Sequence, residues 1–200
     1  MLREQAQLFS DVFAPELFVL LCAVLAVGYE WRRDGTATVQ TLGARYAVLV
    51  VAWGVAFVVY QSSPVWFADP PTWAPDFLGS VGLGVGLLVI AGAWRVGEWG
   101  TLVPDYVGAL LALTAVHLVV TPFWDVSSHV AYTAVPAGAL AVVDRRFAPL
   151  LVVPVGMVFA RPLAGAHTWL QSVGGLVLGA AFVVWFHERS EWTVTGQRSR

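Results

Sequence analysis

Two short polar segments, residues 125–129 and 161–167, hold the residue types that could transfer a phosphoryl group. The first reads Asp-Val-Ser-Ser-His and the second Arg-Pro-Leu-Ala-Gly-Ala-His, so each places a histidine where an apolar segment begins. A histidine can act as a nucleophile or a general acid, and an arginine can hold a phosphate through two N–H groups. If both segments lie on the same side of a membrane, His129, His167 and Arg161 would face one another at one polar mouth.

The composition of the chain indicates an integral membrane protein. Of its 200 residues, 58% are apolar and 12% are charged, whereas charged residues make up about 25% of an average soluble protein. The net charge of −2 and the lack of a basic patch give no reason to expect nucleic-acid binding. Cys22 lies in an apolar run and is expected to be a packed thiol. The polar, acidic start of the chain does not resemble a cleaved signal peptide.

The apolar segments predict an all-α fold, a polytopic membrane bundle of about seven transmembrane helices in one domain over residues 1–200. A spanning helix needs about 20 mostly apolar residues. The candidates are residues 13–28, 44–60, 78–94, 106–121, 129–143, 147–160 and 168–186. The fifth and sixth candidates are short, so a single re-entrant hairpin is an alternative for that pair.

Arginine sets the expected direction of these helices, because cytoplasmic loops concentrate basic residues. All eleven basic residues are arginines. With the N-terminus outside and the C-terminus in the cytoplasm, the outer segments hold only Arg3 and Arg161. The other nine fall in inner segments, namely Arg32, Arg33, Arg45, Arg95, Arg145, Arg146, Arg189, Arg198 and Arg200. Both polar segments are then expected on the extracellular or periplasmic face of the cell membrane.

On this topology two helices begin at the polar segments and present their N-termini outward. A helix N-terminus offers free N–H groups and a positive dipole, which together favour an anion. Ser127 is a suitable N-cap for the helix that starts near His129. Arg161 precedes Pro162, which disfavours helical geometry at Arg161, so we expect a helix to end there with its guanidinium at the outer mouth.

Two further patterns concern the surroundings of these helices. The outer loop at 62–76 is rich in proline and tryptophan, and it fits either an aromatic belt at the headgroup layer or a lid for a lipid substrate. The glycine pairs Gly82/Gly86 and Gly175/Gly179 have the four-residue spacing that lets helices approach closely.

The two polar segments together resemble a known family. The run Ser127-Ser128-His129, followed by small apolar residues and then by Arg161, five residues and His167, is similar to motifs of the type 2 phosphatidic acid phosphatase superfamily. That superfamily includes lipid phosphate phosphatases and vanadium haloperoxidases. The resemblance covers about residues 114–180. It implies a phosphatase-like helical core at 104–187, with N-terminal helices at 1–103 outside the resemblance and a cytoplasmic tail at 188–200.

The resemblance implies a membrane lipid phosphatase. Such an enzyme would hydrolyse a phosphate or pyrophosphate on a lipid or isoprenoid carrier at the outer face, without a cofactor. His167 would be the nucleophile that takes the phosphoryl group, and His129 the acid that protonates the leaving oxygen. Ser127 and Arg161 would hold the phosphate.

The chain departs from the family's motifs at several positions near this expected site. Gln171 stands where the family has the aspartate that orients the nucleophile, and it can accept a His167 N–H through its carbonyl oxygen. Thr121 and Thr114 fall where the first motif has its arginine and lysine. Ser128 replaces a glycine, and Asp125 adds a negative charge. We expect Thr121, Ser128 and Asp125 to line the substrate.

Two alternatives to the phosphatase remain open at this point. The first is a catalytically silent member that keeps the fold as a binding or structural subunit of a membrane complex. The second is a metal-dependent hydrolase, in which Asp125 and His129, four residues apart, join His167 and His117 to supply nitrogen and oxygen ligands suited to zinc.

Overall fold

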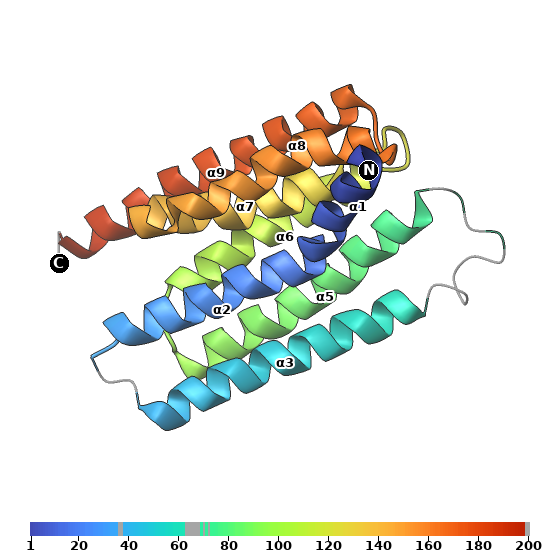
Figure 1. Cartoon of the computed structure of the whole chain (residues 1–200). Coiled ribbons are helices and arrows are strands. Elements are labelled where there is room, and N and C mark those ends of the chain that lie inside the picture. The colour runs from blue at the N-terminus through green and yellow to red at the C-terminus, as the bar shows by residue number, and fades with distance from the viewer. Residues whose placement is uncertain (36–37, 63–68, 70, 72, 199–200) are drawn as a thin grey trace.

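The computed structural model describes the chain except residues 36–37, 63–68, 70, 72 and 199–200, with side chains described up to Arg189. Within this part the chain is all-α, as its composition predicts. The elements are α1 (Leu2–Val12), α2 (Pro15–Arg33), α3 (Val39–Gln61), α5 (Ala74–Gly97), α6 (Leu102–Val120), α7 (Ser128–Val143), the short 3-10 helix η1 (Arg145–Leu151), α8 (Val152–Ala164) and α9 (Trp169–Arg198). The long helices lie side by side along one common direction (Figure 1).

Five stretches of helix in the described residues are long and apolar enough to cross a membrane, or six if the bent pair α1–α2 is one span. The five are Val39–Gln61, Ala74–Gly97, Leu102–Val120, Arg145–Ala164 and Trp169–Arg189. The expected total of about seven is therefore not reached. The difference from six lies at α7, whose 16 residues extend only roughly 24 Å at 1.5 Å per residue, less than the roughly 30 Å hydrocarbon core. The difference from five also includes α2, which meets the test only when it is joined to α1.

Helix α7 is the centre of the bundle. Nearly every residue from Ser128 to Leu140 is buried, and α7 packs against α2, α6, α8 and α9. A helix that is apolar all round is suited to such a position, and its small residues let neighbours come close. Helix α7 is therefore part of the bundle because its neighbours bury it, although it is shorter than a full span.

Close approach of helices occurs at both glycine pairs that the sequence singles out. A Cβ at Gly82 would lie 2.6 Å from the Ala56 carbonyl oxygen of α3, and one at Gly179 would lie 2.6 Å from the Ala134 Cβ of α7. The expected role of these pairs in packing is confirmed. The small residues let α5 lie against α3, and α9 against α7.

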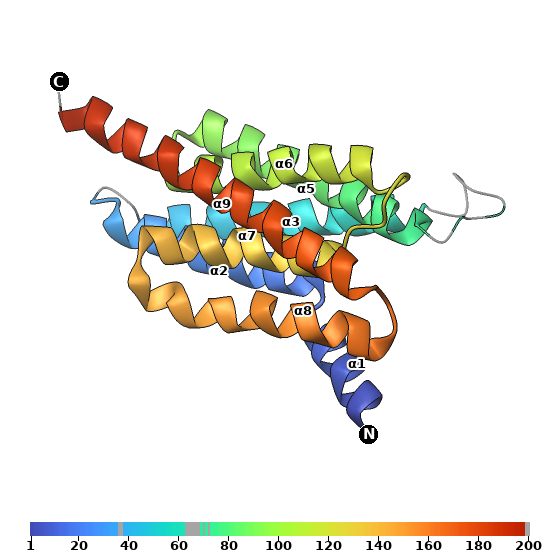
Figure 2. The same cartoon turned by 90° about the horizontal axis from the view of Figure 1, so that it is seen from above.

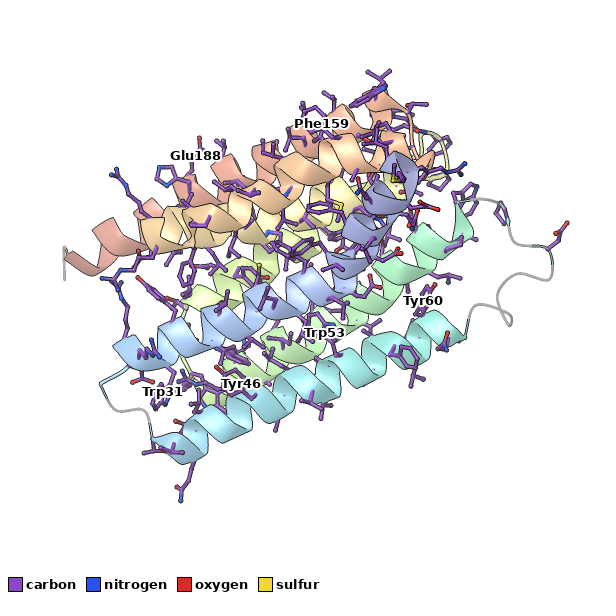
Figure 3. The ribbon with its side chains drawn as sticks, viewed as in Figure 1. Trp31, Tyr46, Trp53, Tyr60, Phe159 and Glu188 are labelled. Carbon is purple, nitrogen blue, oxygen red and sulfur yellow. The ribbon has the colours of Figure 1, made fainter. Side chains whose placement is uncertain are left out.

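Helix α3 covers α2 and α5 on one side and faces outward on the other. Tyr46 and Trp53 reach from α3 toward α2 (Figure 3), where the Trp53 indole N–H donates to the Glu16 carbonyl at 3.1 Å. Its opposite face exposes large apolar side chains, among them Val50, Phe57 and Val58. Exposed apolar faces of this kind suit lipid contact, which supports an integral membrane protein.

Helix α1 is bent by 44° from α2 and packs along α8. Figure 2 shows α1 angled away from the rest of the bundle beneath the end of α8. The Phe9 ring fills the space beside Gly156, where a Cβ would lie 2.6 Å from it. Arg3 Nε donates to the Ala164 carbonyl at 3.1 Å and so caps the end of α8.

The expected end of a helix at Arg161 is wrong by one turn. Pro162 lies inside α8, which continues to Ala164 and ends at Gly165 with a φ of 78°. This left-handed conformation favours glycine, and it allows the N–H of Ala166 to donate to the Arg161 carbonyl at 3.0 Å. The glycine therefore ends the helix. A proline in the last turn disturbs few hydrogen bonds because the helix stops soon after it.

The predictions for the loop at 62–76 lie largely outside the described residues. Asp76 is described, in the first turn of α5. The start of α5 lies at the same end of the bundle as the starts of α7 and α9 and the end of α8 (Figure 1). That end is where both polar segments meet.

Candidate functional site

The site is built from two chain segments, 121–129 and 161–167, that meet at one end of the bundle. The connection 121–127 leads from α6 to α7 and carries Asp125 and Ser127. The first turn of α7 carries Ser128 and His129, and the last turn of α8 carries Arg161. The short connection between α8 and α9 carries His167. Residues nearly forty positions apart in the chain are thereby neighbours.

A backbone contact ties the connection 121–127 to the start of α9. The Ser127 N–H donates to the Gln171 carbonyl oxygen at 3.2 Å. Gly175 makes this approach possible, since a Cβ there would lie 2.7 Å from the Ser127 carbonyl oxygen. Trp124 packs its ring over the neighbouring Gly174, where a Cβ would overlap the ring. A residue without a side chain at 175 is thus required for the two polar segments to meet.

The two histidines of the polar segments and Arg161 are close enough to interact electrostatically. His129 interacts with both Arg161 and His167. His129 Nδ1 also lies 3.4 Å from the Ser128 hydroxyl. A guanidinium and two imidazoles in one place form a set that can hold an anion and exchange protons with it.

His167 faces a carboxylate from the other segment. Its side chain is only 3% exposed, and its Nδ1 lies 3.8 Å from Asp125 Oδ2. Burial lowers the pKa of His167 below its ordinary value of 6.5, and the positive charge of Arg161 lowers it further. Burial raises the pKa of the Asp125 carboxyl, and the positive charge of Arg161 opposes this shift. His167 is therefore a neutral imidazole at neutral pH.

Several buried polar atoms of the site have no hydrogen-bond partner among the described residues. They are Arg161 Nε, His167 Nδ1 and Nε2, Ser127 Oγ, Asp125 Oδ1 and Ser172 Oγ. Ser127 and Ser172 are completely buried. An unsatisfied buried donor or acceptor destabilises a fold by about 1–3 kcal/mol. Buried polar atoms without partners are candidates for contact with a bound ligand.

Gln171 has a capping role at the start of α9. Its side-chain Oε1 accepts the Thr168 N–H at 2.7 Å, and the Thr168 hydroxyl accepts the Gln171 N–H at 3.2 Å. This reciprocal pair is a capping box. The carbonyl oxygen that could orient His167 is directed to the backbone of Thr168, so the structure does not bring Gln171 to His167 as a hydrogen-bond partner.

Thr121 belongs to a buried network around His117. Its hydroxyl lies 3.1 Å from His117 Nδ1 and 2.7 Å from the His117 carbonyl oxygen. Ser80 of α5 also lies 3.1 Å from Nδ1. Tyr132 of α7 extends the network to Ser80 and to Thr114. The hydroxyls of Thr121 and Thr114 thus have hydrogen-bond partners within the protein, unlike the unpartnered atoms at the mouth.

His117 reaches the polar segment through its second ring nitrogen. The His117 side chain is fully buried, and its Nε2 lies 3.3 Å from the Val126 carbonyl oxygen. Because a carbonyl oxygen can only accept, Nε2 carries the proton. His117 therefore anchors the backbone directly beside Asp125.

Sequence reasoning missed two acidic residues of this end of the bundle. Asp76, in the first turn of α5, interacts electrostatically with Arg161 and His167. Asp11, in the last turn of α1, interacts with Arg161. The only signal for Asp76 is its place at an outer helix start, and an acidic residue is common there for the helix dipole alone.

The residues named for a metal site are not arranged as a ligand set. In the described part of the chain no group of three or more His, Cys, Asp or Glu side chains is placed to hold a metal ion. Asp125, His129 and His167 share one end of the bundle, but His117 is engaged with Val126 and Ser80. The metal-dependent alternative has no support in this geometry.

Comparisons with family models, with curated proteins and with solved structures found no match to this chain.

Proposed function

We propose that this protein is a membrane phosphohydrolase that removes a phosphate or pyrophosphate group from a lipid or isoprenoid carrier through a histidine nucleophile. One observation carries the proposal: buried polar atoms of Arg161, His167 and Ser127 have no hydrogen-bond partner among the described residues, at the end of the bundle that also holds His129. The starts of α7 and α9 lie at the same place and add the positive ends of two helix dipoles.

The proposed reaction assigns a step to each histidine. The lone pair of His167 Nε2 attacks phosphorus, and the bond from phosphorus to the leaving oxygen breaks. His129 gives its proton to that oxygen. A water oxygen then attacks phosphorus, His129 takes the water's proton, and the nitrogen–phosphorus bond breaks to release phosphate. Binding of a phosphate dianion favours the protonated form of His129 that the first step needs.

Arg161 and Ser127 stabilise the charge that spreads over the phosphoryl oxygens. Such stabilisation by positioned donors is usually the largest part of catalysis of this kind. The Arg161 guanidinium interacts electrostatically with both histidines, and the Ser127 hydroxyl is buried with its oxygen unpartnered among the described groups.

Exposed apolar side chains around the mouth favour a lipid substrate. Phe123, in the connection between α6 and α7, is 90% exposed, and Leu170, in the first turn of α9, is 71% exposed. Leu163 and Trp169 are also exposed beside them. A substrate with a phosphate head and an apolar tail fits a polar mouth with an apolar surround. The sorting of arginines favours the outer face of the membrane for this end of the bundle.

A binding protein without turnover is the second candidate. The capping role of Gln171 favours it, because the residue that the resemblance assigns to orient the nucleophile is used elsewhere. Such a protein would bind a lipid phosphate and release no inorganic phosphate from it.

Phosphate release by the purified protein in detergent tests the proposal. We expect release from mixed micelles that contain phosphatidate or a polyprenyl diphosphate. His167→Ala should reduce release to background, and His129→Ala should reduce it by about 10²–10⁴, the usual contribution of a general acid. His187→Ala, in α9 toward the opposite end, is the matched control and should retain activity. Release that is equal in the His167→Ala variant would contradict the proposal.

A further inference from the structure

Gln171 and Asp125 are the two side chains that could orient His167, and the structure gives them different hydrogen-bond partners. A nucleophilic imidazole needs its Nδ1–H held so that the Nε2 lone pair faces phosphorus, as the carboxylate does in a catalytic triad. The side chain of Gln171 caps α9 through Thr168. Asp125 Oδ2, by contrast, lies 3.8 Å from His167 Nδ1. A closure of about 1 Å would make this a hydrogen bond, and catalytic hydrogen bonds are often long before substrate binds.

Contacts on both sides of Asp125 fix its backbone. On one side the Trp124 ring packs over Gly174, and the Trp124 carbonyl accepts the Val126 N–H at 2.7 Å. On the other side the Ser127 N–H donates to the Gln171 carbonyl at 3.2 Å, and His117 Nε2 donates to the Val126 carbonyl at 3.3 Å. The backbone that carries the Asp125 carboxylate is therefore held by neighbours on α6 and α9.

His117 is suited to hold this segment because its own tautomer is fixed. With the proton on Nε2, the neutral ring accepts at Nδ1 from the hydroxyl of Ser80 or Thr121, each 3.1 Å away. Ser80 belongs to α5 and Tyr132, which donates to it, belongs to α7. Hydrogen bonds from α5, α6 and α7 thus fix the position of His117, and His117 in turn holds the Val126 carbonyl beside Asp125.

We propose that Asp125 is the positioning carboxylate of His167, in place of the residue at 171, and that the buried His117 network holds it there through the Val126 carbonyl. This inference rests on the proposed function and specifies how the nucleophile is prepared. Asp125 accepts the Nδ1–H, which leaves Nε2 free to attack. The carboxylate lies on the side of the ring away from Nε2. Its attraction for the developing imidazolium therefore acts over a shorter distance than its repulsion of the phosphate.

The protonation state of His167 reports this arrangement without any turnover. The charged and titratable groups that act on His167 are Asp125 on the loop, Asp76 of α5, His117 of α6, His129 of α7 and Arg161 of α8. The chain has four histidines, so ¹⁵N-histidine NMR in detergent resolves them with His→Gln variants for assignment. In the native protein we expect the Nδ1–H tautomer at His167. In Asp125→Asn the pKa of His167 should fall by about one pH unit, the effect of losing an adjacent opposite charge.

Matched variants separate positioning from other roles. Gln171→Ala should leave the tautomer and the pKa of His167 unchanged. His117→Leu should move the His167 pKa in the same direction as Asp125→Asn, and His117→Gln, which keeps a donor for Val126, should restore it. In phosphate release, Asp125→Asn should lower kcat about 10²–10⁴-fold with KM nearly unchanged. The double variant of Asp125→Asn and His117→Leu should lose no more than Asp125→Asn alone, because both act through one carboxylate.

Three results would overturn the inference. One is an unchanged His167 pKa in Asp125→Asn, measured in protein that elutes as the native species on size exclusion. Another is a shift of equal size in Gln171→Ala. The third is a rise in kcat/KM for Asp125→Asn, which would show that the carboxylate only repels the phosphate. If no lipid phosphate is hydrolysed while the NMR results hold, the proposed function fails and the positioning of His167 by Asp125 stands.

Discussion

The behaviour of His167 with pH follows from its surroundings. The proposed nucleophile is the neutral imidazole, and burial with the adjacent Arg161 charge lowers the pKa of His167 below 6.5. As pH falls, the neutral form therefore persists below the range in which an ordinary histidine becomes protonated. Under the proposed mechanism, His167 therefore stays in the reactive neutral form at neutral and mildly acidic pH.

We predict that the acid limb of kcat/KM for phosphate release lies below pH 6.5, the ordinary pKa of a histidine. Arg161→Gln removes a positive charge that lowers the pKa, so the limb should move to higher pH. Asp125→Asn removes a negative charge next to the ring, so the limb should move to lower pH. Full pH profiles of the three proteins on one lipid phosphate give the measurement. Movement of both limbs in the same direction would refute the electrostatic account of His167.

At the scale of the elements, the site depends on how closely α9 approaches the connection 121–127. Gly175 permits that approach, because a Cβ there would lie 2.7 Å from the Ser127 carbonyl. Backbone atoms cannot move aside as the end of a side chain can. A methyl group at this position would separate the two halves of the site.

Gly175→Ala should lower the free energy of unfolding by about 1–3 kcal/mol, the usual effect of overpacking, and should reduce phosphate release strongly. Gly108→Ala in α6 is the matched control, since nothing lies within 4 Å of a Cβ there. Alanine in place of glycine favours a helix by about 1 kcal/mol, so the control should be as stable as the native protein or more so. Thermal unfolding in detergent compares the two variants, and equal stability would count against the packing described for Gly175.

Local sequence patterns predicted most elements and missed those set by tertiary packing. Apolar length predicted the helices that became α3, α5, α6 and α9. It also predicted α7 closely, as residues 129–143 against Ser128–Val143, although this buried central helix is shorter than a full span. Pro162 predicted a helix end at Arg161, but the left-handed Gly165 decides where α8 ends.

The sequence predicted which residues belong to the candidate site better than it predicted which side chains they contact. Spacing alone brought His129, His167 and Arg161 forward, and the structure brings these three together. The partner of His167 could not be predicted, because Asp125 reaches it from another segment. Whether Gln171 faces the imidazole or caps its own helix depends on side-chain rotation, about which spacing says nothing.

For the whole molecule, the orientation in the membrane is a prediction from the distribution of arginines. The site lies at one end of the bundle, with Phe123 at its rim, and the end of α5 with Val96 lies at the other (Figure 1). Both side chains are almost fully exposed, at 90% and 88%. The only cysteine, Cys22, is buried in the core. The chain is therefore suited to cysteine labelling from one side of a membrane.

We expect Phe123→Cys to react with a membrane-impermeant maleimide on intact cells, and Val96→Cys to react only after the membrane is permeabilised. Both substitutions are made with Cys22→Ala, which removes the native thiol. The two positions have nearly the same exposure, so each is the control for the other. The reverse pattern of labelling would place the site on the cytoplasmic face.

The most direct test of the central claim is a search for a phosphorylated His167. The protein is mixed with a ³²P-labelled lipid phosphate and quenched in alkali, where a phosphohistidine survives, and the peptide that carries the label is sequenced by mass spectrometry. The account predicts label on His167, none in His167→Ala, and accumulation of label in His129→Ala when the leaving group needs no proton. Steady phosphate release without label on His167, or equal release by His167→Ala, would contradict it.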